Sequence, residues 1–382
     1  MKVYFDNAAT TPIAPEVLDV MIPMLKEDFG NPSSTHQFGR KTKSAVEMAR
    51  KTIAKRLNCS PMEICFTSGG TEADNMAIHG AINELGVTRI ISSAVEHHAV
   101  LHTVEHCHAD CNVELEMVRL NEKGHVDTDH LRELLESSDQ KTLVSLMHAN
   151  NEIGTMIDLD EIGAICEEHG ALFHSDTVQT MGHYHLDLAK TKVHFVTGAA
   201  HKFHGPKGVG FLYINQNVHI NPMIRGGAQE RNLRAGTENI YGIVGMAKAL
   251  DLALEHVDEH REQVQGIKDY MCMRLQETLP GIAFNGCRER SLYTVLNVRL
   301  PKTDKAEMLL FLLDIDGIAC SGGSACSSGS NQGSHVLRAL GVDTSTPSIR
   351  FSFSRFNTKE EVDYVVEKLA KHLEITKVEE GR

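Results

Sequence analysis

The segment Ala199-Ala200-His201-Lys202-Phe203-His204-Gly205-Pro206-Lys207-Gly208 places a lysine, Lys202, shortly after the apolar run 194–196. A lysine at the end of a buried strand can have its amine pKa lowered and then act as a Schiff-base nucleophile. Asp176 ends the earlier run His174-Ser175-Asp176, and an acidic side chain can protonate the nitrogen of a pyridine ring. The pair therefore predicts a site for pyridoxal phosphate.

Each of these two residues also has a simpler interpretation. Lys202 alone could be a solvated loop lysine, and Asp176 alone could cap the end of a strand. The cofactor site is favoured because other segments of the chain supply the remaining groups that such a site needs.

The composition is that of an ordinary globular protein. The chain has 382 residues, 41% hydrophobic and 23% charged, which is enough for a large core and two domains. A net charge of −13, without a tract rich in lysine and arginine, argues against a DNA or RNA partner. We expect a cytoplasmic protein with no membrane partner, because no apolar stretch has membrane-spanning length. Nine scattered cysteines favour reduced thiols.

Helical patterns alternate with short β-branched runs over the first part of the chain. We expect helices over 45–57, 72–85 and 159–169 and strands over 64–67, 89–92, 143–147 and 171–174. This alternation predicts an α/β sheet with helices on both faces, in which ligands gather at the carboxyl ends of the strands.

The pattern changes after residue 240. Long helices are predicted over 240–278, followed by a strand over 293–300 and an amphipathic helix over 359–373. We therefore expect a large cofactor-binding domain over 15–255 and a small C-terminal domain over 256–382, with residues 1–14 packing against the small domain.

A candidate phosphate site lies in Thr67-Ser68-Gly69-Gly70-Thr71-Glu72-Ala73-Asp74-Asn75, where glycines follow a strand and a helix begins. Glycines let backbone N–H groups approach an anion, and a helix N-terminus adds partial positive charge. Gly70 and Thr71 would then contact the phosphate. The alternative is a plain N-capped helix.

Three more candidates follow predicted strands or lie on one. His97 could stack on a flat cofactor ring and move protons, although a chain with 22 histidines offers many that simply face solvent. Asn151 lies in the turn-like segment 150–154. Arg350, within Ser348-Ile349-Arg350-Phe351-Ser352, could hold a carboxylate with two hydrogen bonds, or it could lie on an exposed strand face.

Cys326 lies in the one stretch of the chain that is markedly rich in glycine and serine, 320–333. A flexible loop of this composition could carry a thiol from a buried substrate to a surface acceptor. The alternative is a connecting segment with an incidental cysteine.

The combination resembles the class V branch of fold-type I pyridoxal-phosphate enzymes and, within it, the cysteine desulfurases of iron-sulfur cluster assembly and nitrogen fixation. The matching segments run almost from end to end: 4–12, 30–34, 68–75, 96–97, 150–154, 176–179, 201–210, 234–239, 323–327 and 348–355. The resemblance implies a large domain with a mixed, mostly parallel sheet flanked by helices, and a smaller α+β domain that carries Cys326.

The resemblance also implies a role for each candidate in binding the cofactor. Lys202 would hold it covalently, Asp176 would pair with its ring nitrogen, and His97 would stack on the ring. Gln179 and Asn151 would contact the ring oxygen. The phosphate contacts would come from Gly70, Thr71 and His201 of one chain and from Thr237 of its mate in a homodimer.

By the same resemblance, Arg350 and Asn151 would hold the substrate carboxylate and Cys326 would accept the sulfur. L-cysteine would become L-alanine, and the Cys326 persulfide would pass its sulfur to an acceptor protein such as an iron-sulfur scaffold. Ala199 departs from the pattern because a hydroxyl residue is usual there, and its loss would weaken cofactor binding by about 1 to 3 kcal/mol unless Thr197 or water substitutes.

Three alternatives stay open. A selenocysteine lyase or an aminotransferase would use the same cofactor residues. A zinc module could form on His106-Cys107-His108-Ala109-Asp110-Cys111, although that cluster has no second half. A non-catalytic scaffold could keep the fold, but it would not need both Lys202 and Cys326.

Overall fold

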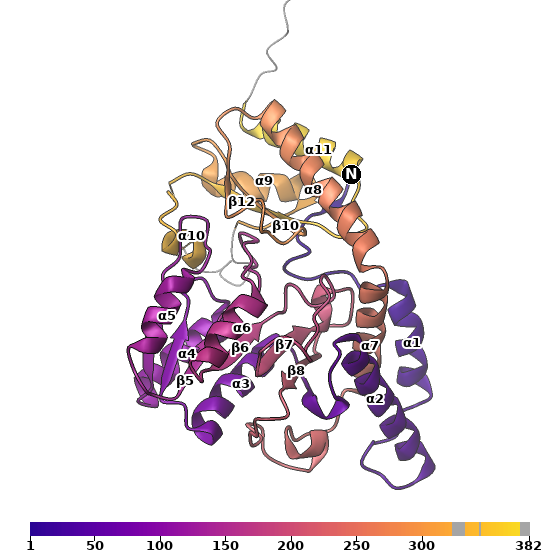
Figure 1. The fold of residues 1–382 in the computed structure, drawn as a ribbon. Coiled ribbons are helices and arrows are strands. Elements are labelled where there is room, and N and C mark those ends of the chain that lie inside the picture. The colour runs from indigo at the N-terminus through magenta and orange to yellow at the C-terminus, as the bar shows by residue number, and fades with distance from the viewer. Residues whose placement is uncertain (323–332, 344, 375–382) are drawn as a thin grey trace, which may run out of the picture.

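The structure is a computed structural model and describes residues 1–322, 333–343 and 345–374. Two units lie one above the other in Figure 1. The lower unit is built around a seven-stranded sheet and the upper unit around a three-stranded sheet. The N-terminus lies in the upper unit close to α11 (Lys359–His372), so the two ends of the described chain share one unit.

The larger sheet has the strand order β2-β8-β7-β6-β5-β3-β4. Its strands are β2 Ile64–Thr67, β3 Arg89–Ser92, β4 Glu114–Met117, β5 Thr142–Ser145, β6 Leu172–Asp176, β7 Phe195–Ala199 and β8 Gly210–Ile214. Only β8 is antiparallel to its neighbours. The carboxyl ends of the other strands meet at one edge of the sheet, where sheets of this kind bind ligands.

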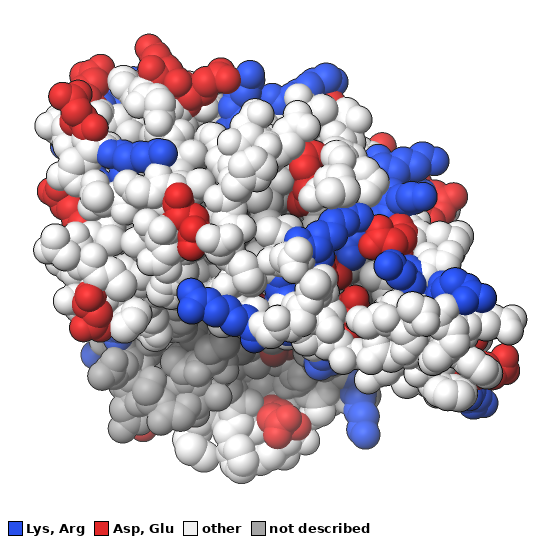
Figure 2. Space-filling model, turned by 90° about the horizontal axis from the view of Figure 1, so that it is seen from below, with Lys and Arg blue, Asp and Glu red and all other residues white. Residues whose placement is uncertain are grey.

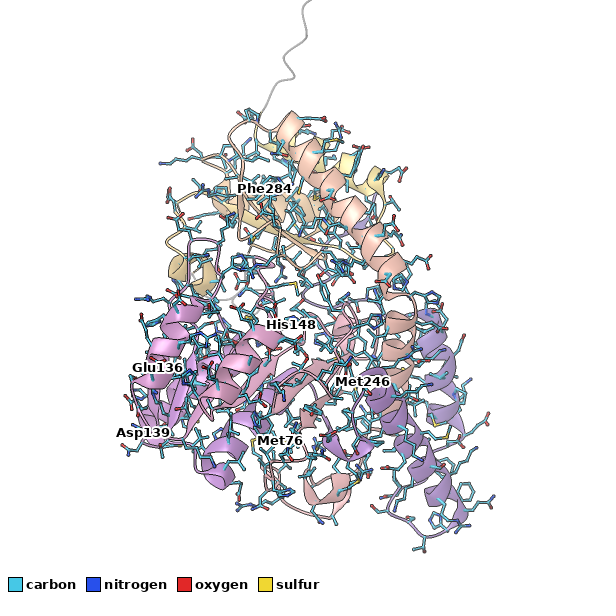
Figure 3. The ribbon with its side chains drawn as sticks, in the orientation of Figure 1. Met76, Glu136, Asp139, His148, Met246 and Phe284 are labelled. Atoms are coloured by element: carbon cyan, nitrogen blue, oxygen red, sulfur yellow. The ribbon has the colours of Figure 1, made fainter. Side chains whose placement is uncertain are left out.

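Helices cover both faces of this sheet because successive residues of a strand point to opposite sides. In β3, Ile91 packs into one core and Ile90 into the other. The first core is covered by α1 Pro15–Lys26, α2 Gln37–Arg56, α5 Thr128–Glu136, α6 Leu159–Glu168 and α7 Ile240–Glu255, and the second by α3 Gly70–Leu85 and α4 His98–Asp110. Figure 3 labels Met246 in the first core and Met76 in the second.

The upper unit has its own hydrophobic core around an antiparallel sheet of order β12-β10-β9. Its elements are α8 Val257–Thr278, β9 Ala283–Asn285, β10 Val295–Arg299, α9 Leu309–Ile315, α10 His335–Ala339, β12 Ser348–Ser352 and α11. The N-terminus joins it through β1 Val3–Tyr4, which pairs in parallel with β11 Ile318–Ala319. Phe284, labelled in Figure 3, packs against this core.

The two units join where α7 ends and α8 begins. Buried side chains of α7 belong to the core of the lower unit, whereas those of α8 from Val264 onward belong to the core of the upper unit. This change of core supports our proposal of a domain boundary near residue 255.

Charged side chains of both signs are interspersed over the face of the molecule shown in Figure 2. Among the described residues, no helix is both long enough and apolar enough to cross a membrane.

Candidate active site

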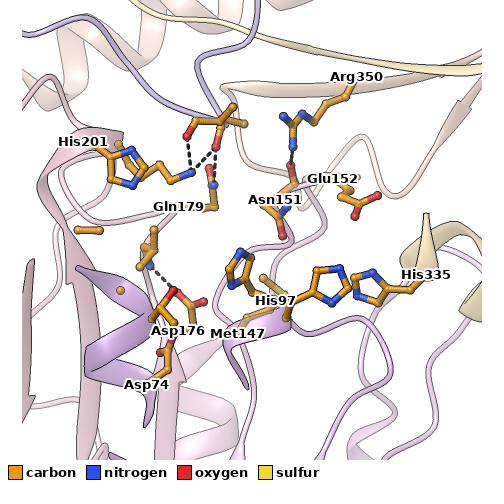
Figure 4. Close-up of a pocket in the computed structure, with 18 residues that line it drawn as sticks. Asp74, His97, Met147, Asn151, Glu152, Asp176, Gln179, His201, His335 and Arg350 are labelled. Carbon is orange, nitrogen blue, oxygen red and sulfur yellow. Dashed lines mark hydrogen bonds between the residues drawn. The ribbon is translucent and has the colours of Figure 1, made fainter. Parts of the chain in front are cut away.

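A cavity of about 250 Å³ lies at the carboxyl ends of the parallel strands (Figure 4). Residues of the lower unit form most of its wall, and α10 and β12 of the upper unit add His335 and Arg350. Residues singled out from the sequence come together here from distant parts of the chain: Gly70, Thr71, His97, Asn151, Asp176, Gln179, His201, Lys202 and Arg350.

Lys202 follows β7 at the end of a single 3-10 turn, Ala200–Lys202. Its Nζ donates hydrogen bonds to the carbonyl oxygens of Ala8 at 2.5 Å and Ala9 at 2.9 Å. Gln179 Nε2 also donates to the Ala8 oxygen, at 3.0 Å. The N-terminal segment therefore forms part of the cavity wall and holds the lysine amine.

Asp176 is the last residue of β6, and its carboxylate accepts a hydrogen bond from the backbone N–H of Val178 at 2.8 Å. Asp74 of α3 lies close to it, as Figure 4 shows. Burial raises the pKa of both carboxyl groups, and repulsion by Asp74 raises that of Asp176 further, whereas His97 opposes the rise. A cation placed beside Asp176 would relieve this cost, so the site suits a protonated ring nitrogen.

The imidazole of His174 lies behind the two carboxyl groups, with Nε2 3.4 Å from Asp74 Oδ1. Burial lowers the pKa of His174 to about 4. The ring is therefore neutral near pH 7, and its contact with Asp74 is not an ion pair. Among the described residues, Asp74 Oδ1 has no hydrogen-bond partner.

His97 precedes α4 and caps its N-terminus, because its Nδ1 accepts a hydrogen bond from the backbone N–H of Ala99 at 3.1 Å. Burial lowers the pKa of His97, although Asp176 acts in the opposite direction. The neutral ring therefore carries its proton on Nε2. A neutral imidazole fixed in this way can stack on a flat ring and still exchange one proton.

The predicted phosphate site lies at the N-terminus of α3. A Cβ atom at Gly70 would lie only 2.8 Å from Val178 Cγ2, so this position needs glycine. His201 Nδ1 lies 3.2 Å from the hydroxyl of Thr10. Burial lowers the pKa of His201 to about 4. Backbone N–H groups, the Thr71 hydroxyl and a neutral imidazole thus meet where an anion would bind.

Neither Thr197 nor Thr237 lines this cavity. Ala199 lines it without a hydroxyl group, and Thr197 and water were the two expected substitutes for that hydroxyl. Thr197 and Ala199 are two positions apart on β7 and so point to the same face, but Thr197 is fully buried and its hydroxyl lies 3.3 Å from His174 Nε2. Thr237 lines a separate pocket with Arg234 and Asn239, and its contact with a dimer mate stays a prediction.

Arg350 lies on β12 with only 1% of its surface exposed. One terminal nitrogen donates to the carbonyl oxygen of Asn151 at 3.0 Å, and the other to Asp6 Oδ1 at 2.8 Å. Among the described residues, its buried Nε has no hydrogen-bond partner. Arg350 also lines the cavity, so its guanidinium is a candidate to bind a substrate carboxylate there.

Several residues of the cavity wall were not predicted from the sequence. Asp74 and Glu152 lie inside the candidate segments 67–75 and 150–154, but no role was predicted for them. Glu152 is fully buried and accepts a hydrogen bond from the Ser334 hydroxyl at 2.5 Å. The ring of His335 lies against that of His98, with centroids 4.4 Å apart and the planes tilted by 38°, a contact that only the tertiary fold creates.

Cys326 lies outside the described residues. The zinc alternative gains no support in the part of the chain that the structure describes, where no group of three or more His, Cys, Asp or Glu residues could hold a metal ion. Within that motif His106 instead pairs with Asp110, at 2.7 Å.

Comparison with known proteins agrees with this geometry. The model of the family "Aminotransferase class-V" matches residues 3–365. A protein of Dictyoglomus turgidum named "Cysteine desulfurase IscS" is 43% identical over 98% of this chain and 95% of its own. Another of that name, from Methanosarcina thermophila, is 43% identical over 96% of this chain and 90% of its own.

Solved structures give the same result. A structure named "NIFS-LIKE PROTEIN" superposes with a TM-score of 0.91 at 37% identity, covering 98% of this chain and 100% of that one. A NifS-like protein from Rickettsia africae has a TM-score of 0.89 at 31% identity, covering 98% of this chain and 100% of its own. The chain therefore belongs to the class V aminotransferase family and, within it, to the cysteine desulfurases.

Proposed function

We propose that the protein is a pyridoxal-phosphate-dependent cysteine desulfurase that converts L-cysteine to L-alanine and transfers the sulfur to Cys326. One observation carries this proposal: a single cavity is lined by Lys202, by Asp176 with its buried carboxyl group, and by Arg350 with its guanidinium group. Together these groups suit an amino-acid substrate bound beside a pyridine cofactor.

Pyridoxal 5′-phosphate fits the residues of the cavity. Lys202 would hold it through Nζ, Asp176 would face its ring nitrogen, and His97 would stack on its ring. Gln179 and Asn151 would contact the ring oxygen, and the phosphate would lie at Gly70, Thr71 and His201. When bound, the cofactor supplies an electron sink that stabilises negative charge on the substrate carbon.

The side chains of the protein then perform the remaining steps. Arg350 and Asn151 bind the α-carboxylate, and Lys202 Nζ takes up the α-proton. The Cys326 thiolate attacks the substrate sulfur, so that an S–S bond forms while the Cβ–S bond breaks and its electron pair returns to carbon. His97, which lines the cavity, would then add a proton at Cβ, and Lys202 Nζ would return the α-proton to Cα, which completes L-alanine.

The products balance as one alanine and one Cys326 persulfide for each cysteine. An acceptor protein, such as an iron-sulfur scaffold, or a small-molecule reductant would then remove the outer sulfur from the persulfide. The reductant releases it as sulfide.

We further propose a cytoplasmic homodimer. The helix α1 exposes Leu18, Ile22 and Leu25 on one face, and Phe29 beyond it is 73% exposed. An apolar surface of this kind suits an interface with a second copy, which could bring Thr237 to the phosphate of its mate. A reducing compartment agrees with the eight cysteines in the described part of the chain, which are all unpaired.

The test is to measure alanine and sulfide from L-cysteine with a reductant present, for the wild type and Cys326→Ala side by side. Equimolar products from the wild type alone would support the persulfide route. Equal activity of the two proteins would contradict it and favour a lyase that needs no acceptor thiol, and selenocysteine would then be the next substrate to try.

A further inference from the structure

The carboxylate of Asp6 connects two residues of the upper unit. Its Oδ1 accepts hydrogen bonds from Arg350 Nη2 and from the Ser321 hydroxyl, both at 2.8 Å. Asp6 follows β1, and Arg350 lies on β12, so the contact joins segments 344 positions apart in the chain. The first residues of the protein thus determine how this arginine lies.

The hydrogen bonds of Arg350 show which side of the guanidinium is occupied. Asp6 Oδ1 accepts a hydrogen bond from one terminal nitrogen, and the carbonyl oxygen of Asn151 accepts one from the other. The Nε atom is buried and, among the described residues, has no partner. Two fixed acceptors therefore hold the plane of the guanidinium of Arg350, a residue that lines the cavity.

A guanidinium buried in this way would turn if one acceptor were lost. It would then leave donors unsatisfied or aim them away from the cavity. Asp6 itself is held by backbone contacts, because its carbonyl oxygen accepts from Ala9 N–H at 3.0 Å and the residue pairs with Ser352 of β12. The same N-terminal segment supplies the acceptors of Lys202, so it contacts both ends of the substrate site.

We propose that Asp6 is a positioning residue that orients Arg350 toward the α-carboxylate of the substrate, and so sets the preference for amino acids over the corresponding amines. The inference rests on the proposed function. Both Arg350 and Ser321 donate to one oxygen, Oδ1, and Asp6 also forms an ion pair with the buried guanidinium. Asparagine keeps an acceptor oxygen at this point but loses the charge, whereas alanine keeps neither. Asparagine should therefore replace Asp6 in part, and alanine should not replace it.

The experiment compares the binding of L-alanine and ethylamine, which differ by the carboxylate, followed by the visible absorbance of the holoenzyme. In the wild type we expect alanine to bind more tightly. In Asp6→Ala the ratio of the two dissociation constants should fall by about 10- to 100-fold, mainly through weaker binding of alanine. In Asp6→Asn the ratio should fall clearly less than in Asp6→Ala, because the amide oxygen can still accept both hydrogen bonds.

Further variants test whether Asp6 acts on selectivity through Arg350. If Asp6 acts through Arg350, the double variant Asp6→Ala with Arg350→Ala should be no less selective than Arg350→Ala alone. Ser321→Ala should leave selectivity unchanged, because the Ser321 hydroxyl donates to the same Asp6 oxygen but does not line the cavity. Should Asp6→Ala fail to fold, Asp6→Ser, which is too short to reach Arg350, tests the same loss.

Retained selectivity in Asp6→Ala or Asp6→Ser would overturn the inference, as would additive losses in the double variant or a matching loss in Ser321→Ala. Failure of the proposed function would look different, because the wild type itself would then form no alanine from L-cysteine. The KM for L-cysteine gives an independent measure: we expect Asp6→Ala to raise KM more than it lowers kcat.

Discussion

Lys202 Nζ and the carbonyl oxygen of Ala8 lie 2.5 Å apart although 194 positions separate them in the chain. The N-terminal segment therefore supplies acceptors for the amine that would bind the cofactor. Attachment of the cofactor replaces at least part of this hydrogen bonding, because Nζ then has fewer hydrogens to donate. The N-terminal segment and the bound cofactor would therefore both contact the same side chain, that of Lys202.

Replacing Lys202 should abolish covalent attachment of the cofactor. We expect Lys202→Ala to lose the visible absorbance of the bound cofactor and all formation of alanine, since no other amine takes its position in the proposed site. Absorbance spectra of the purified proteins check this. Lys190→Ala, which changes an exposed lysine paired with Asp187, is the matched control and should keep both properties.

Ala199→Ser should strengthen cofactor binding. Ala199 lines the cavity without a hydroxyl, whereas the Thr197 hydroxyl lies beside His174 and does not line the cavity. One added hydrogen bond to the phosphate, at about 1 to 3 kcal/mol, would tighten binding by about 5- to 150-fold. Equilibrium dialysis measures this, with pyridoxal as the control because it has no phosphate. A gain of equal size for pyridoxal would contradict a phosphate contact.

Sequence patterns predicted strands and helices correctly where the local preference of a segment agrees with its place in the tertiary structure. The predicted strands 64–67 and 89–92 coincide with β2 and β3, and the predicted helix 159–169 matches α6 to within one residue. The expected helix at 45–57 was too short, because α2 begins at Gln37. Its first turns have few apolar residues, so periodicity alone could not reveal them.

The site was predictable where one residue carries distinctive chemistry, as Lys202 and Asp176 do. It was not predictable where a role depends on a neighbour brought in by folding. Asp74 matters because it lies beside Asp176, Ala8 because its backbone oxygen meets Lys202, and Asp6 because it contacts Arg350. These contacts join distant segments, and no local pattern records them.

Asp176→Asn should lower activity while stabilising the cofactor-free protein. The amide cannot carry the charge that keeps a ring nitrogen protonated, so we expect kcat to fall by roughly 100-fold or more. The same change removes the repulsion from Asp74, which contributes to the raised pKa of Asp176. The melting temperature of the cofactor-free protein should therefore rise, whereas the kcat of the cofactor-bound enzyme should fall. A variant that lost both would point to a purely structural role.

The pH dependence of stability should reveal the buried carboxyl group of Asp74. Burial raises its pKa to about 7, whereas an unfolded aspartate titrates near pH 3.9. Between these two values the folded state binds more protons than the unfolded state, so this group makes the protein less stable as pH rises, by at most about 1.4 kcal/mol per pH unit.

Asp74→Asn removes that titration. Compared with the variant, the cofactor-free wild type should lose stability between about pH 5 and pH 7, and the difference should level off above the folded pKa. Denaturant unfolding at several pH values measures it, with Asp139→Asn, a change at a loop position between α5 and β5, as the matched control. A difference between wild type and Asp74→Asn that stays constant across this range would show that Asp74 is already ionised in the folded protein.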